Sequence, residues 1–586
     1  MKTAKSSVRP IARHIRCLIW ETNPAIATFC MACLCQVALP AWSTTEPPHH
    51  DEQQASTTSI CAPVSLNGSW LFRFEERKAI EQTEGMTFTP NDVMCVPGCW
   101  DVMPTYYLKR GTGLYRRNFH LDQPMKDAVL EVEGMGLRGK FAIDGRELGE
   151  YPYPYAKLEI PVGPLAKGDH EIFAALDNRF DWNTMKLACP YYDFYFYGGF
   201  YRGVRLVEKQ PKIFVRTLDY RTGKVEVEIE GKRKYTQNIP DFKLWSPESP
   251  NLTTIEVEGR QVRFGIRQIE TRNGKIYLNG KEIFLKGVNR HDQTPLFGAA
   301  VPESQWLMDL QHVKALGGNF IRGSHYQQAD RFLDLCDEMG IMVWEESLGW
   351  GNGQSYTDPN NIELHDEAFR AAQIKETRDM VRASFNHPSV IIYAFMNECS
   401  SEKPECKTLV DELIRTIKAE NPERLVTFAC NKCNDDICNE HTDIIAFNAY
   451  PGTIPMYPGE PADLKEKVRK RFTEIVSGFR QRYPDKPIMV SESGVAAVYG
   501  WHDAAASIST EELQDEYLTD IFETLWSNPD VVGFAIWQMN DNRTYSRTSV
   551  DWPGKTYMGH SQAGIFDLQR RPKKAVETVK KYFSKR

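Results

Sequence analysis

The sequence predicts a multidomain protein in which two antiparallel β domains precede a (β/α)8 barrel. From residue 60 to residue 208, short alternating runs of apolar and polar residues are separated by Gly, Pro and Asp-Gly, a pattern typical of antiparallel strands. Residues 209–270 continue this pattern over a shorter length. From residue 271 to residue 586, short apolar runs alternate with amphipathic stretches of helical period, which is typical of parallel strands with helices between them.

The two β domains are expected to be sandwiches of unequal size. The first contains the runs "LNGSWLFRFE", "GLYRRNFHL", "AVLEVEGM" and "FAIDGRELGEY", and Asp144-Gly145 in the last run is a strong hairpin signal. The second contains "KVEVEIEG" and "TTIEVEGRQVRFGIRQIE". Its roughly 60 residues are few for a complete immunoglobulin-type sandwich, which usually needs about 100. We therefore expect the second domain to be shortened.

The third region contains eight apolar runs that are candidate barrel strands. In chain order they are "IFLKGVNRH", "NFIRGSHY", "IMVWEES", "VIIYAFMNE", "RLVTFACN", "IIAFNAY", "PIMVSESG" and "VVGFAIWQ". Amphipathic stretches such as "SQWLMDLQHVKALG" and "CKTLVDELIRTIKAE" lie between them. A doubly wound open sheet is the alternative, but eight regular strand–helix units favour a closed barrel.

Polar residues end every one of these eight runs. They are Asn289 and His291, Arg322 and His325, Glu345 and Glu346, Asn397 and Glu398, Asn431, Asn448 and Tyr450, Glu492, and Trp537 and Gln538. One or two such ends would only mean that a strand has reached solvent. In a (β/α)8 barrel the active site lies at the C-terminal ends of the strands. Eight polar ends therefore predict one lined pocket.

Glu398 and Glu492 are the candidate catalytic pair. They end the fourth and seventh strands, which face each other across an eight-stranded barrel. Glycoside hydrolysis needs two carboxyl groups, one that protonates the leaving oxygen and one that attacks or stabilises the anomeric carbon. Either glutamate alone would as readily be the partner of a barrel Arg or Lys. Two of them among Asn, His, Tyr and Trp suit sugar hydroxyls better than a structural ion pair.

Charge and composition favour a carbohydrate as the partner. The 586 residues include 71 Lys and Arg against 78 Asp and Glu, a net charge of −7 with no visible basic patch, which argues against nucleic acid. Aromatic residues make up 11% of the chain, including 13 Trp. Aromatic rings pack on the apolar faces of sugars, although this content also suits any large β-rich core. The sequence leaves open whether the protein forms a homo-oligomer.

The N-terminus predicts export. Basic residues precede an apolar run from Pro24 to Ser43, so residues 1–43 are interpreted as a signal peptide that is cleaved near Ser43. The run is short for a membrane span. The mature protein is then expected to be periplasmic or associated with the cell surface. A lipid anchor on Cys33 or Cys35 is the weaker alternative, because the residues before each fit a lipobox poorly.

A cysteine-rich loop, "CNKCNDDICNEH", has a spacing reminiscent of a zinc site. Its candidate ligands are Cys430, Cys433, Cys438 and His441. Because no second arm completes a zinc domain, a disulfide or free buried thiols are favoured over a metal. Cys95 and Cys99 in "CVPGC" are a further candidate disulfide pair.

Many of these motifs resemble glycoside hydrolase family 2, the family of β-galactosidases and β-glucuronidases. In the barrel region the similar motifs are "LKGVNRHD", "NFIRGSHY", "CDEMGIMVWEE", "NHPSVIIYAFMNE", "DIIAFNAY", "KPIMVSESG" and "GFAIW". Upstream, "GLYRRNF", "DFYFYGGFYRGVRLV" and "KLWSPESPNL" resemble the family's jelly-roll-like sugar-binding and immunoglobulin-like domains. The resemblance covers the chain from about residue 66 to the C-terminus.

The resemblance implies a retaining, exo-acting β-glycosidase with Glu492 as the nucleophile and Glu398 as the acid/base. It implies that Asn397 holds the 2-hydroxyl of the sugar and that Arg322 and Tyr450 bind Glu492. The complete set of expected substrate-binding residues is Asp193, His291, Arg322, His325, Asn397, Asn448, Tyr450 and Trp537.

At the positions that select the terminal sugar, the chain departs from both the galactosidase and the glucuronidase pattern. Val495 stands where large β-galactosidases have a His, so this position is more similar to the glucuronidases. Glucuronidases, however, place Asn-x-Lys before Gly-Ile-Phe, and here Ser561 and Ala563 occupy those two places. A buried carboxylate without its cation loses a charged contact after losing its hydration. Since this disfavours a glucuronide, the preferred hypothesis is a β-galactosidase, with a β-glucuronidase or another β-glycosidase of the family as the alternative.

Two further expectations concern cofactors and a non-catalytic rival. Some family galactosidases bind Mg²⁺ through a Glu and a His after the third strand. This chain keeps Glu346 but has no nearby His, so we expect no metal and no cofactor. A catalytically silent carbohydrate-binding protein is the rival hypothesis, and the presence of both glutamates argues against it.

Overall fold

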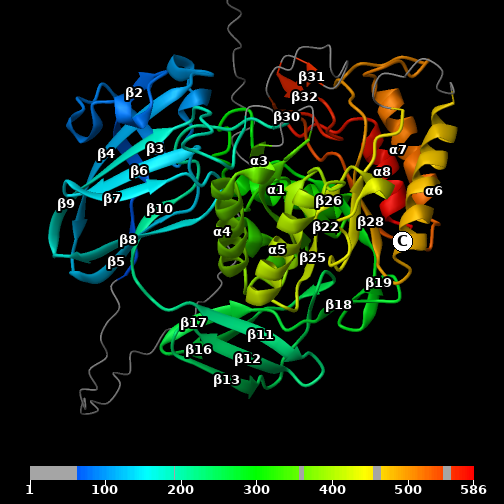
Figure 1. Cartoon of the computed structure of the whole chain (residues 1–586), viewed down its shortest axis with the longest axis horizontal. Coiled ribbons are helices and arrows are strands. Elements are labelled where there is room, and N and C mark those ends of the chain that lie inside the picture. The colour runs from blue at the N-terminus through cyan, green and yellow to red at the C-terminus, as the bar shows by residue number, and fades with distance from the viewer. Residues whose placement is uncertain are drawn as a thin grey trace, which may run out of the picture. The chain divides into compact units, whose positions relative to one another are not determined.

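The computed structural model describes residues 62–189, 192–354, 362–452, 463–544, 556–557 and 559–585. It confirms the predicted fold class, with mostly β structure before residue 285 and a parallel barrel after it (Figure 1). The predicted signal peptide, including Cys33 and Cys35, lies outside the described residues. Within the described residues no helix is both long enough and apolar enough to span a membrane.

The first β domain is a sandwich of two antiparallel sheets. The strands are β1 (Val64–Ser65), β2 (Gly68–Glu76), β3 (Asp92–Val96), β4 (Gly111–Leu121), β5 (Met125–Val132), β6 (Arg138–Ile143), β7 (Arg146–Tyr151), β8 (Leu158–Leu165), β9 (Gly168–Asp177) and β10 (Val204–Glu208). One sheet has the order β3-β2-β4-β9-β6-β7 and the other β1-β10-β5-β8. Phe72 and Phe141 of the first sheet and Leu130 and Ile160 of the second belong to one buried core. The predicted hairpin at Asp144-Gly145 joins β6 to β7.

The second β domain is small. Its main strands are β11 (Ile213–Asp219), β12 (Lys224–Ile229), β13 (Arg233–Asn238), β16 (Thr253–Val257) and β17 (Arg260–Phe264). The sheets β11-β12-β13 and β16-β17 share one core that includes Val225, Val227 and Phe264. Short connecting strands are β14 (Trp245–Ser246), β15 (Ser249–Pro250), β18 (Ile269–Arg272), β19 (Lys275–Leu278) and β20 (Lys281–Ile283).

All eight predicted apolar runs are strands of the barrel. They are β21 (Leu285–Asn289), β22 (Phe320–Arg322), β23 (Met342–Trp350), β24 (Val390–Asn397), β25 (Leu425–Thr427), β26 (Ala429–Cys430), β27 (Ile445–Asn448), β28 (Ile488–Ser493) and β29 (Val531–Ile536). The order is β25-β24-β23-β22-β21-β29-β28-β27-β26. β25 and β26 are the two parts of one predicted strand, interrupted at Phe428. Because the Glu398 amide donates to the Ala429 carbonyl, the end of β24 also contacts β26.

Helices lie between the barrel strands (Figure 1). They are α1 (Glu303–Ala315), α2 (Asp330–Met339), α3 (Ile362–His365), α4 (Glu367–Ala383), α5 (Pro404–Glu420), α6 (Leu464–Arg482), α7 (Glu511–Leu525) and α8 (Ala575–Phe583). Each long helix buries one face. In α5, for example, Leu409, Leu413 and Ile417 recur every four residues and are all buried, as an amphipathic helix requires. Three short strands, β30 (Asn542–Arg543), β31 (Thr556–Tyr557) and β32 (His560–Ser561), follow β29.

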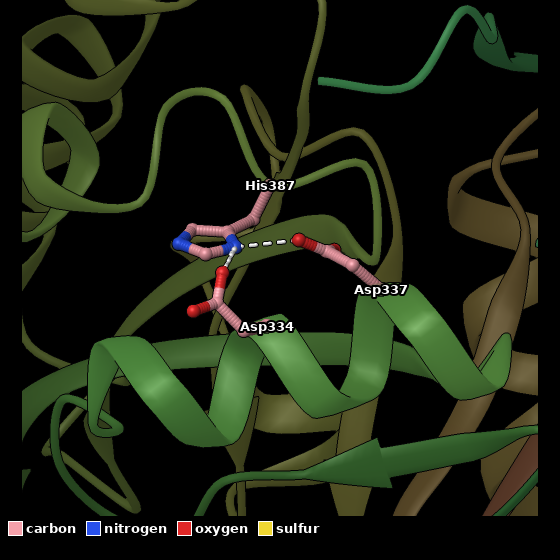
Figure 2. Close-up of side chains that lie close together, drawn as sticks. All are labelled: Asp334, Asp337 and His387. Carbon is pink, nitrogen blue, oxygen red and sulfur yellow. Dashed lines mark hydrogen bonds and ion pairs between the residues drawn. The ribbon is translucent and has the colours of Figure 1, made fainter. Parts of the chain in front are cut away.

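An ion pair fixes the start of β24, the strand that leads to Glu398. Figure 2 shows His387 beside Asp337 and Asp334 of α2, with Nδ1 2.6 Å from Asp337 Oδ2 and 3.9 Å from Asp334 Oδ1. In the described part of the chain, this is the one group of His, Cys and acidic residues close enough to hold a metal ion. Both carboxylates already have protein donors, since Ser389 N donates to Asp337 and Arg263 donates to Asp334. We interpret the group as an ion pair.

The pair predicts a pH-dependent contribution to stability. Burial lowers the pKa of His387, but the neighbouring carboxylates, Asp337 first, outweigh this and raise it to about 9. Because the folded pKa exceeds the unfolded value of about 6.5, the stabilisation is fully present below pH 6.5 and is lost as the pH rises through about 9. Asp337→Asn should therefore lower the free energy of unfolding by about 1–3 kcal/mol at pH 6 and by much less at pH 10.

Urea unfolding of wild type and variant at pH 6, 8 and 10 measures this difference. Asp379→Asn, which removes an exposed partner of Lys375 on α4, is the matched control and should change little at any pH. If Asp337→Asn lowers the free energy of unfolding by the same amount at pH 6 and pH 10, the charge of His387 contributes nothing to stability.

Candidate active site

Arg322, the last residue of β22, organises the polar end of the barrel. It is completely buried and donates to Glu492 Oε1 at 2.5 Å, to Glu346 Oε1 and Oε2 at 3.0 and 2.9 Å, to Asn289 Oδ1 at 3.1 Å and to Asn397 Oδ1 at 2.9 Å. Burial disfavours a charged guanidinium, but Glu346 and Glu492 outweigh this and raise the pKa of Arg322 above its ordinary value. One cation thus joins four strand ends.

Glu492, near the end of β28, has a donor on each carboxylate oxygen. Arg322 binds Oε1, and the Tyr450 hydroxyl donates to Oε2 at 2.5 Å. Burial and the negative charges of Glu492 and Glu398 hold the pKa of Tyr450 well above its ordinary value. Tyr450 therefore stays protonated and keeps its donor. A cation and a phenol together fix the carboxylate in one orientation.

Glu398 directly follows β24, and in the described part of the chain amide groups bind its carboxylate. Asn448 Nδ2 donates to Oε1 at 2.9 Å and Asn431 Nδ2 to Oε2 at 3.3 Å. The backbone here has positive φ at Met396 (45°) and Glu398 (52°), an unfavourable conformation for residues with a side chain. Such strain persists only where the surrounding structure enforces it, and it is common at functional sites.

Hydrogen bonds with the segment that follows β23 hold this strained turn in place. The Gly351 amide donates to the Asn397 carbonyl at 2.8 Å, and the Gln354 side chain donates to the Glu398 carbonyl. The Ser400 amide donates to the Asn352 carbonyl at 2.9 Å. The turn is therefore fixed on both sides of Glu398.

Aromatic rings line the side of the site next to Glu492. The rings of His291, His325 and Trp537 lie 5.4–5.5 Å from one another, and His325 is stacked on Trp537. Phe194, from the β-sandwich domain, packs against His291 at 5.3 Å and His325 at 5.8 Å. Asp193 precedes it, is buried, and lies near enough for its charge to act on His291. This wall therefore combines residues of two domains.

Several buried polar atoms of the site have no partner in the described residues. They are both ring nitrogens of His291, Trp537 Nε1 and Asn397 Nδ2. Burial first, and then the neighbouring His325, holds the pKa of His291 well below its ordinary value, so the ring is neutral. Because buried polar groups nearly always have a hydrogen-bond partner, these atoms suit the hydroxyl groups of a ligand.

Gly494 allows β28 to approach Trp537. A Cβ at Gly494 would lie 1.8 Å from the Trp537 carbonyl oxygen, so no other residue fits here. The Trp537 amide donates to the Ser493 carbonyl at 2.9 Å. The Glu492-Ser493-Gly494 sequence thus places the tryptophan beside Glu492.

The structure places some predicted residues differently. The Asn448 amide is used by protein groups, since Nδ2 also donates to Asn397 Oδ1 at 3.1 Å and Oδ1 accepts from Ser491 at 2.8 Å. Glu345 lies outside the site: it accepts from the Gln328 amide at 2.9 Å, and burial raises its pKa to about 7. Successive strand residues point to opposite faces, so only Glu346 of this pair reaches Arg322.

The cysteine-rich loop does not form a metal site or a disulfide among the described residues. Cys430, Cys433 and Cys438 are buried and free, while His441 is exposed. The sequence left three interpretations open: a metal site, a disulfide or free buried thiols. The structure has free buried thiols at Cys430, Cys433 and Cys438. Cys95 and Cys99 are also unpaired.

The position of the family's uronate-binding lysine has no cation in this chain. Ala563 is buried, and Ser561 Oγ lies 3.4 Å from Gln538 Nε2. Lys573 is also buried here, but it donates to Asp541 Oδ1 at 2.7 Å and to the carbonyls of Ala497 and Gln562. Its charge is already compensated.

Five residues of the site are absent from the expected catalytic and substrate-binding residues: Phe194, Asn289, Glu346, Asn431 and Ser491. Asn289, Glu346 and Asn431 were visible as polar strand ends, but nothing local showed which side chains they bind. Phe194 comes from another domain and has no periodic signal.

Comparisons with known proteins agree with this architecture. The model of the TIM barrel domain of glycosyl hydrolases family 2 matches residues 269–586, more than half of the chain. A β-glucuronidase of Streptococcus agalactiae is 24% identical over 587 residues, which covers 88% of this chain and 95% of that protein. A β-galactosidase of Thermoanaerobacter pseudethanolicus is 26% identical, over 56% of this chain and 49% of that protein.

A solved structure is also similar. The β-galacturonidase from Eisenbergiella tayi, crystallised with galacturonate, has a TM-score of 0.77 and 27% identity, covering 90% of this chain and 98% of that chain. The similarity therefore includes the β domains as well as the barrel. Together with the family match over the barrel, it shows that this chain belongs to glycoside hydrolase family 2.

Proposed function

We propose that the protein is a retaining, exo-acting β-glycosidase that removes a terminal β-linked uronic acid, with Glu492 as nucleophile and Glu398 as acid/base. One observation carries the mechanism: in the described part of the chain, two glutamates at strand ends of one barrel have contrasting contacts, a cation and a phenol on Glu492 and two amide groups on Glu398. Pairs of carboxyl groups in different environments take different roles in catalysis.

The geometry suits a double displacement. Glu492, oriented by Arg322 and Tyr450, attacks the anomeric carbon while Glu398 gives a proton to the leaving oxygen. Water then releases the sugar from Glu492, and Glu398 takes the proton back. Asn397 Nδ2, buried and without a partner in the described residues, is placed to bind the 2-hydroxyl, a contact that strengthens in the transition state.

Phe194 supports exo action. It comes from the β-sandwich domain and packs on both histidines of the aromatic wall, which limits the space beyond the terminal sugar. The neutral His291 and Trp537 then supply hydrogen-bonding groups to that sugar.

The relatives favour a uronic acid over the galactose expected from the sequence. The S. agalactiae relative is a β-glucuronidase, and the E. tayi structure is a β-galacturonidase holding galacturonate. A second candidate, β-galactosidase activity, is favoured by Ser561 and Ala563, which put no cation where family glucuronidases bind the carboxylate. The T. pseudethanolicus relative carries that activity.

A panel of nitrophenyl glycosides separates the two candidates. We expect the β-glucuronide or the β-galacturonide to be hydrolysed with a higher kcat/KM than the β-galactoside and β-glucoside, and we expect no release from the α-anomers. Initial rates at several substrate concentrations give these values. Preferential hydrolysis of the β-galactoside would replace the proposed sugar but keep the mechanism.

Substitution of each glutamate tests the two roles. Glu492→Ala should abolish turnover of every substrate, because no covalent intermediate can form. Glu398→Ala should lower kcat/KM by about 10²–10⁴-fold for a poor leaving group, and much less for a dinitrophenyl glycoside, which leaves without a proton. Glu345→Gln, outside the site, is the matched control. Ordinary turnover by Glu492→Ala would reject the assignment.

A further inference from the structure

Asn431 ends the split barrel strand, one residue after β26, and reaches Glu398. Its Nδ2 lies 3.3 Å from Glu398 Oε2, whereas Asn448 donates to Oε1. Its Oδ1 is buried and has no hydrogen-bond partner in the described part of the chain. A buried acceptor without a partner is costly, so this oxygen is available to a ligand group that carries a donor.

Residues on both sides of Asn431 connect its segment to Glu398. Lys432 Nζ donates to Gln354 Oε1 at 2.9 Å, and the amide of that same glutamine donates to the Glu398 carbonyl. The Glu398 amide in turn donates to Ala429, two residues before Asn431. The segment 429–432 therefore contacts three parts of Glu398: the backbone amide, the carboxylate and, through Gln354, the carbonyl.

Asn431 also lies on a different side of Glu398 from the groups that bind the terminal sugar. Asn448 Nδ2 donates to Glu398 Oε1 and also to Oδ1 of Asn397, the residue proposed to bind the 2-hydroxyl. Oε2 faces Asn431 instead. In the proposed mechanism Oε2 is the oxygen that meets the glycosidic oxygen, so the leaving group would lie on the side of Asn431.

We propose that Asn431 is a positioning residue for the acid/base: it directs Oε2 of Glu398 toward the glycosidic oxygen, and its free Oδ1 accepts a hydrogen bond from a hydroxyl of the leaving group. The inference rests on the proposed function. It specifies the substrate further, as a glycan or other hydroxylated leaving group on the bond that is cleaved.

The proposal is tested with Asn431→Ala and the isosteric Asn431→Asp, each on two substrates with the same terminal sugar. One substrate is a disaccharide and the other is a dinitrophenyl glycoside. For Asn431→Ala we expect kcat/KM for the disaccharide to fall at least tenfold and kcat/KM for the dinitrophenyl glycoside to stay within about twofold, because only the first reaction needs a well-placed acid.

The pH profile of kcat/KM for the disaccharide gives a second readout. The N–H of Asn431 favours the ionised form of Glu398, and a carboxylate at this position would disfavour it. The basic limb should therefore move to higher pH in Asn431→Ala and further in Asn431→Asp. Among the described residues, the titratable or charged groups near Glu398 include Tyr450 and Cys433, Glu492 and Arg322 behind Tyr450, and Lys432 beside Asn431, and both variants leave them in place.

Asn434→Ala is the matched control, since Asn434 lies in the same loop, is exposed and donates to the Glu474 carbonyl at 3.2 Å. It should leave both readouts unchanged. Equal losses on the two substrates, or an unmoved basic limb in both Asn431 variants, would overturn the proposal while the wild type remains active. A wild type that hydrolyses no β-glycoside would instead reject the proposed function, and this inference with it.

Discussion

The buried charge of Arg322 is the interaction on which the polar end of the barrel depends. A guanidinium with no exposed surface loses its hydration, and only close opposite charges and complete hydrogen bonding compensate for that loss. Arg322 has both, in Glu346 and Glu492, with the two asparagines Asn289 and Asn397 on its remaining donors. A lysine has no planar fork of donors and could not bind four strand ends at once.

The same arrangement explains why the site contains a third carboxylate. Arg322, Glu346 and Glu492 together carry one net negative charge, and the proposed mechanism uses the charge of Glu492. When Glu492 forms the proposed ester with the sugar, the pair of Arg322 and Glu346 remains neutral and hydrogen-bonded. Glu346 thus keeps the arginine paired throughout the reaction, whereas an isolated Arg322 would be left as an uncompensated buried cation.

The sequence was sufficient for the barrel strands and for the positions of Glu398 and Glu492 at the ends of two of them, because both follow from local patterns. It was insufficient where the direction of a side chain, or a contact between segments far apart in the chain, decides which residues reach the site. Glu345 and Glu346 look equivalent along the chain, but the alternation of β23 turns only Glu346 inward. Asn431 depends on the interruption of its strand at Phe428, and Phe194 depends on the docking of another domain, which no periodicity encodes.

The chemistry of the pocket also limits how strongly it can select its sugar. Gln538 and Ser561 themselves supply neutral groups. The two cations described nearby are already engaged, Lys573 by Asp541 and Arg543 by the rings of Tyr107 and Tyr195. A hydrogen bond to a charged donor is roughly twice as strong as one between neutral groups. A uronate bound by neutral donors such as Trp537 Nε1 would therefore gain less over a neutral sugar than it gains in a site with a lysine. The ratio of kcat/KM between uronide and galactoside is thus expected to be modest, because recognition depends on the shape of the aromatic wall more than on charge.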